Sequence, residues 1–366
     1  MTCLEKVLAQ YHFFLCLFAY AHMKLYLQKN PAMINLFLSQ YNLLTTLPHQ
    51  FTITDVDVCT DVTITLGNID IYTTRLYENG GKATLYGFRD IVRENMLARG
   101  LSLASLTIRA QEEAGEFVIS GKYILFSEAT CMGDVEDIIW RRFLTTRSFY
   151  VLPLDCDFPV SFFSDADEQF TTYADCIFKD TDGTLHTYTY ELQTTLYNDP
   201  HVYCEYITPG FMKETIERRE GRQLGTMVSF TFHTGQRSIT AYISDEPYEV
   251  DFYFRNSFNT TEHVFVYGTT VKKTVISRKE AVSQGVTSFY DKSVERRHEV
   301  ETSPMSMEEA EWFNEFLESS HVYRWLNDDW QPEVLISDIT SEISDNAKEL
   351  VKMKFSWRYN DNSIWI

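Results

Sequence analysis

The feature that most constrains the fold is an alternating run near the C-terminus, at residues 351–359. Val351, Met353, Phe355, Trp357 and Tyr359 alternate there with polar or basic residues. A period of two puts every apolar side chain of the run on one face of a β-strand. A strand with one apolar face must cover a core that earlier parts of the chain supply. The run therefore predicts a C-terminal β-sandwich or barrel.

The composition favours sheet along the whole chain. Phe, Tyr and Trp number 26, 22 and 6, against 15 Gly and 9 Pro, and aromatic residues suit a pleated, half-buried surface. A length of 366 residues leads us to expect two or three domains. The predicted fold class is mainly β, between all-β and α+β. It consists of several β-sandwiches with a few short helices, and one helix packs on the C-terminal sandwich.

Changes of pattern divide the chain into four parts. An N-terminal segment, residues 1–50, precedes a β-rich domain with short helices at residues 51–152. Residues 153–223 predict a β-hairpin or sandwich domain. Residues 224–366 predict the C-terminal sandwich, whose helix over residues 306–318 begins with a Ser-x-x-Glu capping box. One strand is expected over residues 62–72, another over 271–276, and further helices at 89–98, 135–143 and 210–219.

Three interpretations remain open for the apolar residues 7–21. The stretch follows Lys6 and ends in Ala-Tyr-Ala, as a signal peptide does. It also fits a buried helix or strand, or an over-extended start in which Met23 is the true first residue. The stretch is too short and too polar for a membrane span, so no membrane association is expected.

The charge balance disfavours binding of free nucleic acid. The chain has 32 Lys and Arg against 52 Asp and Glu, a net charge of −20, which repels a phosphate backbone. Its seven cysteines are odd in number, irregularly spaced and without Cys-x-x-Cys. That pattern argues against a disulfide framework or a zinc site. Reduced thiols in a cytoplasm are the simplest interpretation.

No motif for catalysis or cofactor binding stands out. The sequence contains neither Gly-x-Ser-x-Gly nor a glycine-rich phosphate loop. Residues 180–183, Asp-Thr-Asp-Gly, resemble the start of a calcium loop, but the glycine falls at the fourth place instead of the sixth. We predict a hairpin turn there. Asp155 and Asp157 suit either a glycosidase pair or solvated loop acids. We expect no catalytic residue, no metal ligand and no cofactor.

The candidate interface residues are aromatic and basic. Trp312 falls beside the helix stripe that is expected to face the core. Exposed aromatic residues on an amphipathic helix mark contact surfaces, and core packing is the alternative for each of them. The basic clusters 272–273 and 296–297 are expected either to meet acids of a neighbouring subunit or to be solvated strand edges. The aromatic candidates are Trp312, Phe316, Trp325 and Trp330.

A set of C-terminal segments carries a family resemblance. They are VDFYFRNSFN at residues 250–259, SFYD at 288–291, VLISD at 334–338, EISD at 342–345 and KFSWRY at 354–359. From about Met23 onward, the chain resembles uncharacterised proteins encoded among the tail morphogenesis genes of Bacteroidetes prophages. It is more remotely similar to tail-tube and distal-tail proteins, which is an analogy of fold. The resemblance implies ring assembly, often sixfold, in a virion tail built in the bacterial cytoplasm. It offers no catalytic residue.

Three functions follow as hypotheses. The first is a non-enzymatic structural subunit of a phage tail or baseplate, a homo-oligomeric ring that contacts other tail proteins. The second is a carbohydrate-binding module or adhesin that meets a host-surface glycan. The third is a glycoside hydrolase-like enzyme on a β scaffold. The resemblance and the failed motif search favour the structural subunit.

Overall fold

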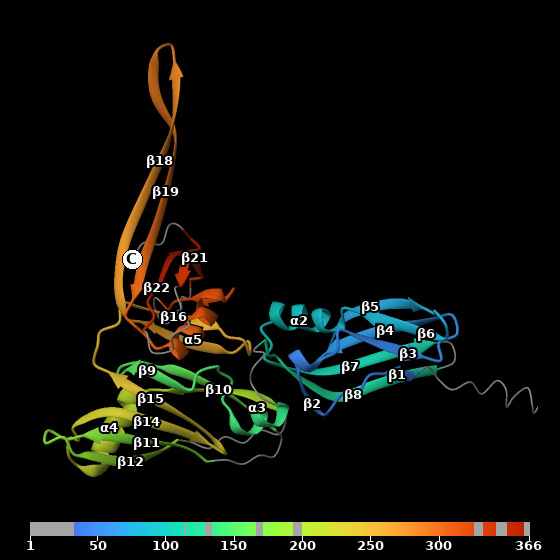
Figure 1. Cartoon of the computed structure of the whole chain (residues 1–366), viewed down its shortest axis with the longest axis horizontal. Coiled ribbons are helices and arrows are strands. Elements are labelled where there is room, and N and C mark those ends of the chain that lie inside the picture. The colour runs from blue at the N-terminus through green and yellow to red at the C-terminus, as the bar shows by residue number, and fades with distance from the viewer. Residues whose placement is uncertain are drawn as a thin grey trace, which may run out of the picture. The chain divides into compact units, whose positions relative to one another are not determined.

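The chain folds into two compact units that are mainly β (Figure 1). The computed structural model describes residues 33–112, 115–128, 134–165, 171–192, 200–325, 332–341 and 350–361. Unit 1 spans Met1–Arg99 and Ala104–Leu125, and unit 2 spans Gly100–Leu103 and Phe126–Ile366. The predicted fold class is confirmed. No helix among the described residues is both long and apolar enough to cross a bilayer.

Unit 1 holds two sheets and helix α2 (Phe88–Ala98). The larger sheet has the strand order β2-β8-β7-β4-β5, and the smaller has the order β1-β3-β6. Phe88 of α2 meets Phe51 of β3 edge to face, with ring centroids 5.2 Å apart, so the helix shares the interior of the smaller sheet. The strands are β1 (Met33–Asn35), β2 (Tyr41–Leu43), β3 (Gln50–Thr54), β4 (Cys59–Leu66), β5 (Ile69–Tyr77), β6 (Lys82–Tyr86), β7 (Leu103–Glu112) and β8 (Gly115–Leu125), and η1 is Leu44–Thr46.

The single strand expected over residues 62–72 is wrong, because β4 and β5 form a hairpin there. Leu66 pairs with Ile69 across a two-residue loop in which Gly67 has a φ of 61°. Glycine adopts such a positive φ without steric cost, and two-residue hairpin loops require one. The alternation of apolar residues continues on both sides of this loop, and it conceals the reversal of the chain in the sequence.

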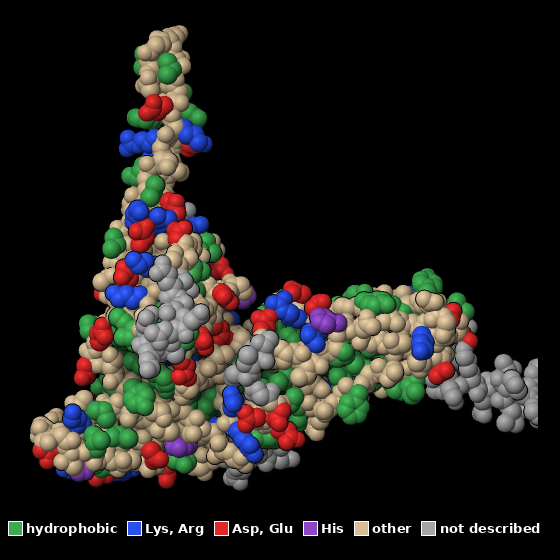
Figure 2. Space-filling model, viewed as in Figure 1, with side chains coloured by type: hydrophobic (Ala, Val, Ile, Leu, Met, Phe, Trp, Pro, Cys, Tyr) green, Lys and Arg blue, Asp and Glu red, His purple; other side chains and the backbone are tan. Residues whose placement is uncertain are grey.

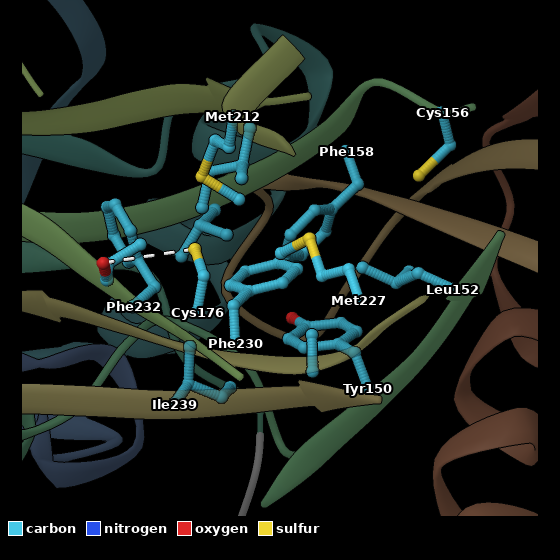
Figure 3. Packing of buried hydrophobic residues seen from close by; sticks show 14 of the residues in the cluster. Tyr150, Leu152, Cys156, Phe158, Cys176, Met212, Met227, Phe230, Phe232 and Ile239 are labelled. Carbon is cyan, nitrogen blue, oxygen red and sulfur yellow. Dashed lines mark hydrogen bonds between the residues drawn. The ribbon is translucent and has the colours of Figure 1, made fainter. Parts of the chain in front are cut away.

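Unit 2 contains two hydrophobic cores, and the first lies under the sheet β12-β11-β14-β15-β9. Figure 3 shows Phe230 and Phe232 of β14, Cys176 of β11 and Tyr150 of β9 pointing toward one another. The strand pair β10–β13 and helix α4 (Pro209–Glu220) cover them. The strands are β9 (Phe149–Pro153), β10 (Phe158–Ser164), β11 (Thr172–Lys179), β12 (Leu185–Leu192), β13 (His201–Ile207), β14 (Thr226–Thr234) and β15 (Arg237–Ser244), and helix α3 is Val135–Arg141.

This sheet runs across two of the predicted domain boundaries. Strand β9 contains the boundary at residues 152/153 and pairs in parallel with β15. Strand β14, from beyond the boundary at residues 223/224, pairs with β11 from before it. Alternation of apolar and polar residues identifies a strand but not the strand with which it pairs. The sequence patterns therefore did not show that these segments belong to one sheet.

The second core of unit 2 lies between two further sheets and helix α5 (Met307–Glu318). Phe252 packs against both Phe316 of α5 and Trp357 of β22, with ring centroids 5.4 and 5.3 Å away. The sheets have the orders β17-β16-β20 and β18-β19-β22-β21. The strands are β16 (Val250–Arg255), β17 (Thr261–Val266), β18 (Gly268–Ser283), β19 (Val286–Thr302), β20 (Val322–Tyr323), β21 (Val334–Ser341) and β22 (Met353–Tyr359).

Two expectations for this region are confirmed. Helix α5 begins with the predicted capping box, in which Glu309 N donates to Ser306 Oγ at 3.2 Å and Ser306 N donates to Glu309 Oε2 at 3.0 Å. The alternating apolar residues of β22 are buried together. The strand begins at Met353, since Val351 forms only an isolated bridge to Met305.

Candidate protein-interaction site

A long two-stranded arm stands out from unit 2 (Figure 1). It consists of β18 and β19, which pair from Gly268↔Thr302 at the root to Ser283↔Val286 at the tip. Strand β22 pairs with β19 only between His298 and Glu301. Beyond that root, no other described strand pairs with the arm. We define the arm as residues 268–302.

The turn at the tip explains why this hairpin forms. Gln284 and Gly285 have φ angles of 53° and 79°, and two consecutive positive φ values match the twist of the flanking strands. The sequence predicted residues 271–276 of β18 and a polar strand that ends near Thr302. Gln-Gly is a weaker turn signal than Asn-Gly, and the mixed polarity of the arm hides its two-residue period, so the hairpin that joins these strands was missed.

The arm exposes large apolar side chains that a free surface does not explain. Ile276 is 50% exposed, Phe289 58% and Tyr290 66%. Of the arm residues, only Val300 at the root belongs to a hydrophobic core of unit 2 among the described residues. An isolated two-stranded hairpin is marginally stable in water. Exposed apolar side chains gathered on one element mark an interaction site. The arm is therefore the candidate functional site.

The two faces of the arm differ in charge. Residues directly opposite in an antiparallel pair lie on the same face. One face, the paired face, has the ion pairs Lys279–Asp291 at 2.8 Å and Lys273–Glu299 at 2.9 Å. The other, the basic face, holds the rungs Arg278↔Lys292, Ile276↔Val294, Thr274↔Arg296 and Lys272↔His298. These rungs contain no acidic residue. Figure 2 shows basic and hydrophobic side chains along the arm.

The root of the arm is fixed to the second core. The His298 ring stacks on Trp357 with centroids 4.0 Å apart. Burial, with the charges of Lys272 and Arg324, lowers the pKa of His298 to about 4. The imidazole is therefore neutral at pH 7 and adds a ring stack to the ion pairs Arg297–Asp338 and Glu301–Lys354, at 2.9 and 3.0 Å, which also join the arm root to the body.

A cavity of about 170 Å³, the root pocket, opens beside the arm root. It lies where the two cores of unit 2 meet, since Phe265 belongs to the first core and Phe313 to the second. Two acids, Glu246 and Glu309, share the lining with these rings. The remaining lining residues are Arg147, Val151, Ser244, Val266, Tyr267, Thr302, Ser303, Pro304, Met305 and Trp312.

A buried polar cluster lies behind the root pocket. Glu262 accepts hydrogen bonds from Trp312 Nε1 at 2.8 Å and from Asn256 Nδ2 at 2.6 Å. Asn256 Nδ2 also donates to Leu144 O at 2.7 Å, and the guanidinium carbon of Arg147 lies 3.7 Å from the Trp312 ring centroid. The cluster ties α5 to the loop before β9 and to the β16–β17 turn, so it positions the pocket wall.

Two of the aromatic interface candidates are interior residues. Trp312 is 5% exposed and Phe316 is fully buried, so neither is available to a partner in this structure. The expectation that Trp312 lies beside the core-facing stripe is wrong. Its indole N–H satisfies the buried Glu262, and that contact widens the buried side of the helix.

The other two candidates differ. Trp325 is 41% exposed and meets Tyr253 edge to face, with ring centroids 6.3 Å apart. Tyr253 also stacks on Tyr323 at 5.6 Å. Trp330 lies outside the described residues. Of the four candidates, only Trp325 is thus placed at a described surface.

Asp157, one acid of the possible glycosidase pair, lies among other polar side chains in unit 2, and several potentially reactive residues of this unit are buried or hydrogen-bonded. His263 has Asp251 Oδ2 and Asp157 O each 2.9 Å from a ring nitrogen, and it is buried. Burial raises the pKa of the Cys156 and Cys176 thiols to about 12, so thiolate is scarce at neutral pH. The hydroxyl of Thr208 donates to Asp157. These contacts give the groups structural roles.

The predicted turn at residues 180–183 is confirmed. Gly183 N donates to Asp180 O at 3.0 Å, and Asp182 Oδ1 accepts from Thr184 N at 2.9 Å. The Asp182 carboxylate thus bonds to its own turn. Within the described ranges, no group of three or more His, Cys, Asp or Glu side chains is placed to hold a metal ion.

Comparison with known proteins adds no assignment. No protein-family model matches the chain, and no curated protein matches it.

Proposed function

We propose that the chain is a non-enzymatic structural subunit that assembles into a homo-oligomer through its β18–β19 arm. The observation that carries the proposal is the arm itself, which exposes Phe289, Tyr290 and Ile276 far from either core of unit 2. Forming a long hairpin that buries little of its own surface costs conformational entropy without a compensating core. Burial against another subunit supplies that compensation.

The finer proposal is that this assembly belongs to a phage tail or baseplate, with other tail proteins as neighbours. It rests on the resemblance of the C-terminal segments to prophage tail-region proteins. The arm supports it, because a ring needs an element of each copy that reaches beyond its own body. Deletion of the gene from a phage that encodes it should leave particles without functional tails, seen by electron microscopy. Intact, infectious particles would contradict this assignment.

The arm-shortened variant tests the structural role. Residues 278–292 are replaced by Asn-Gly, which closes the hairpin after the rung Ser277↔Ser293. The full-length chain should show a sedimentation coefficient that rises with protein concentration, and the shortened chain should sediment as a monomer throughout. The removed residues contribute to neither core of unit 2, so we expect the thermal unfolding midpoint to stay within about 3 °C of the parent.

Two results would contradict the proposal. A full-length chain that remains monomeric at every concentration has no self-assembly for the arm to support. A shortened chain that assembles as the parent does would show that the arm is dispensable. Matching circular dichroism spectra of the two chains serve as the control for folding.

An aromatic surface in unit 2 favours carbohydrate binding as a second candidate. Trp325 and Tyr206 are exposed, while Tyr253 and Tyr323 stack beside Trp325. Flat exposed rings beside polar groups are suited to sugar rings. A glycan array should then give a specific signal that Trp325→Ala reduces by about 10-fold or more. An array without signal for the parent chain would remove this candidate.

A further inference from the structure

We infer that the tip of the arm of one copy, taken as residues 278–292, docks on the root pocket of a second copy, with Arg278 facing Glu246 and Phe289 filling the apolar part of the pocket. This inference rests on the proposed function and names the partner of the arm. Each step depends on the composition and placement of these two surfaces, both of which belong to unit 2.

The tip presents a cation together with an aromatic ring. The guanidinium carbon of Arg278 lies 5.3 Å from the Phe289 ring centroid, so one insertion would bury both groups. Both side chains are exposed; Lys292 stands opposite Arg278 and Glu280 stands opposite Phe289, so cations outnumber acids two to one around the ring. The partner of this tip must offer an apolar hollow with a negative charge at its mouth.

The root pocket has this complementary composition. Its walls include the rings of Phe265 and Phe313, its acids are Glu246 and Glu309, and its cation, Arg147, lies over the Trp312 ring at the pocket wall. Glu309 Oε2 accepts hydrogen bonds from Ser306 N and Oγ in the capping box. Glu246 is exposed, and its carboxylate accepts a long hydrogen bond from Ser303 Oγ at 3.4 Å. Glu246 is therefore the acid best placed to meet an incoming cation.

The tip cannot reach the pocket of its own chain. Ten residues separate Arg278 from Gly268 at the root, which is about 33 Å of extended strand at roughly 3.3 Å per residue. The pocket includes Thr302 and Ser303, at the root end of the arm. A paired hairpin held at its root by the His298–Trp357 stack does not fold back on itself. The occupant must come from another molecule.

The overall charge favours a second copy as that molecule. The arm carries seven Lys and Arg against five Asp and Glu, a net charge of +2, and the rest of the chain carries −22. The arm of one copy is thus attracted to the body of the next. Tip and pocket are different surfaces, so the contact is heterologous and propagates head to tail, closing into a ring if the rotation allows.

A pair of charge reversals tests this contact. Arg278→Glu places an acid at the tip, and Glu246→Arg places a cation at the pocket. Each variant alone should self-associate at least about 10-fold more weakly than the parent in sedimentation velocity, because like charges then meet. An equimolar mixture should assemble as the parent does, since every tip then finds an opposite pocket in the other variant.

The control leaves the opposite face charged and paired. Lys279→Asp combined with Asp291→Lys reverses an ion pair of the paired face and should change self-association by less than about 2-fold. Because all these side chains are exposed, unchanged circular dichroism spectra are expected throughout.

Several results would overturn the inference. One is that either reversal variant alone assembles as the parent does, and another is that the equimolar mixture of the two stays dissociated. Assembly of the parent that needs a different added protein would assign the pocket to that protein. If the parent assembles and the arm-shortened chain does not, while the reversals have no effect, this contact fails and the proposed function stands. If the parent never assembles, both fail.

Discussion

Phe316→Ala should lower the free energy of unfolding of unit 2 by about 3–5 kcal/mol, the usual cost of truncating a buried phenylalanine. Phe316 is fully buried and packs on Phe252, Phe254 and Phe355, with ring centroids 5.4, 5.5 and 5.9 Å away. Removing the ring leaves a cavity between α5 and two sheets, which rigid strands fill poorly. Urea unfolding followed by tryptophan fluorescence measures the loss.

Trp325→Ala is the matched control. This tryptophan is 41% exposed, so its truncation should cost less than about 1 kcal/mol. Because Phe316 and Trp325 were both candidate interface residues, the pair separates core packing from surface display. Equal, small effects of the two substitutions would contradict the position of Phe316 in the second core.

Glu262→Gln should change how stability depends on pH. Burial and the nearby Glu315 raise the pKa of Glu262 to about 7, against the opposing hydrogen bonds from Asn256, Thr145 and Trp312. The unfolded carboxyl titrates near 4.5. A folded-state pKa above the unfolded one means that the folded state holds its proton longer. The stability that the protonated Glu262 carboxyl contributes to the folded state is therefore fully present below pH 4.5 and is lost as the pH rises through 7.

The expected size of this change is about 3 kcal/mol, from about 1.4 kcal/mol for each pKa unit between 4.5 and 7. Glutamine does not ionise, so the stability of the variant relative to the parent should rise by that amount between pH 4 and pH 8. Denaturant unfolding at a series of pH values measures it. The relative measure is needed because His298, whose pKa is lowered to about 4, gives the parent an opposing slope over part of the same range.

Glu311→Gln supplies the control for this titration. Glu311 lies on the same helix as Trp312, and its side chain is exposed. Its substitution should leave the pH profile of the parent unchanged. A Glu262→Gln profile parallel to that of the parent would show that the Glu262 carboxyl titrates as an ordinary surface acid, and that the buried cluster is wrongly understood.

Local patterns determined the secondary structure best where one segment contains the whole signal. The alternating residues of β22 predicted a strand with one buried face, and Ser306 with Glu309 predicted the start of α5. The Asp-Gly turn before Thr184 was predicted in the same way. Backbone conformation and strand period depend on near neighbours, so the sequence contains the necessary information.

The sequence did not determine which strands pair or which aromatic side chains are buried. The pairing of β14 with β11 joins segments that looked like separate domains, because a β-strand offers two equivalent edges. Trp312 is buried against Phe254, and Glu262 accepts its N–H; both residues are distant from Trp312 in the sequence.

The arm shows the same division between sequence and tertiary structure. The clusters 272–273 and 296–297 were visible as basic pairs, and their expected contact with acids of a neighbouring subunit stays a prediction. Only the register of β18 with β19 places Lys272 and Arg296 on one face and Lys273 with Arg297 on the other. Which face a residue occupies depends on strand register, and register is set by the Gln284-Gly285 turn and by pairing over the whole length of the hairpin. The sequence by itself determined the residues of the site, and the tertiary structure decided their arrangement.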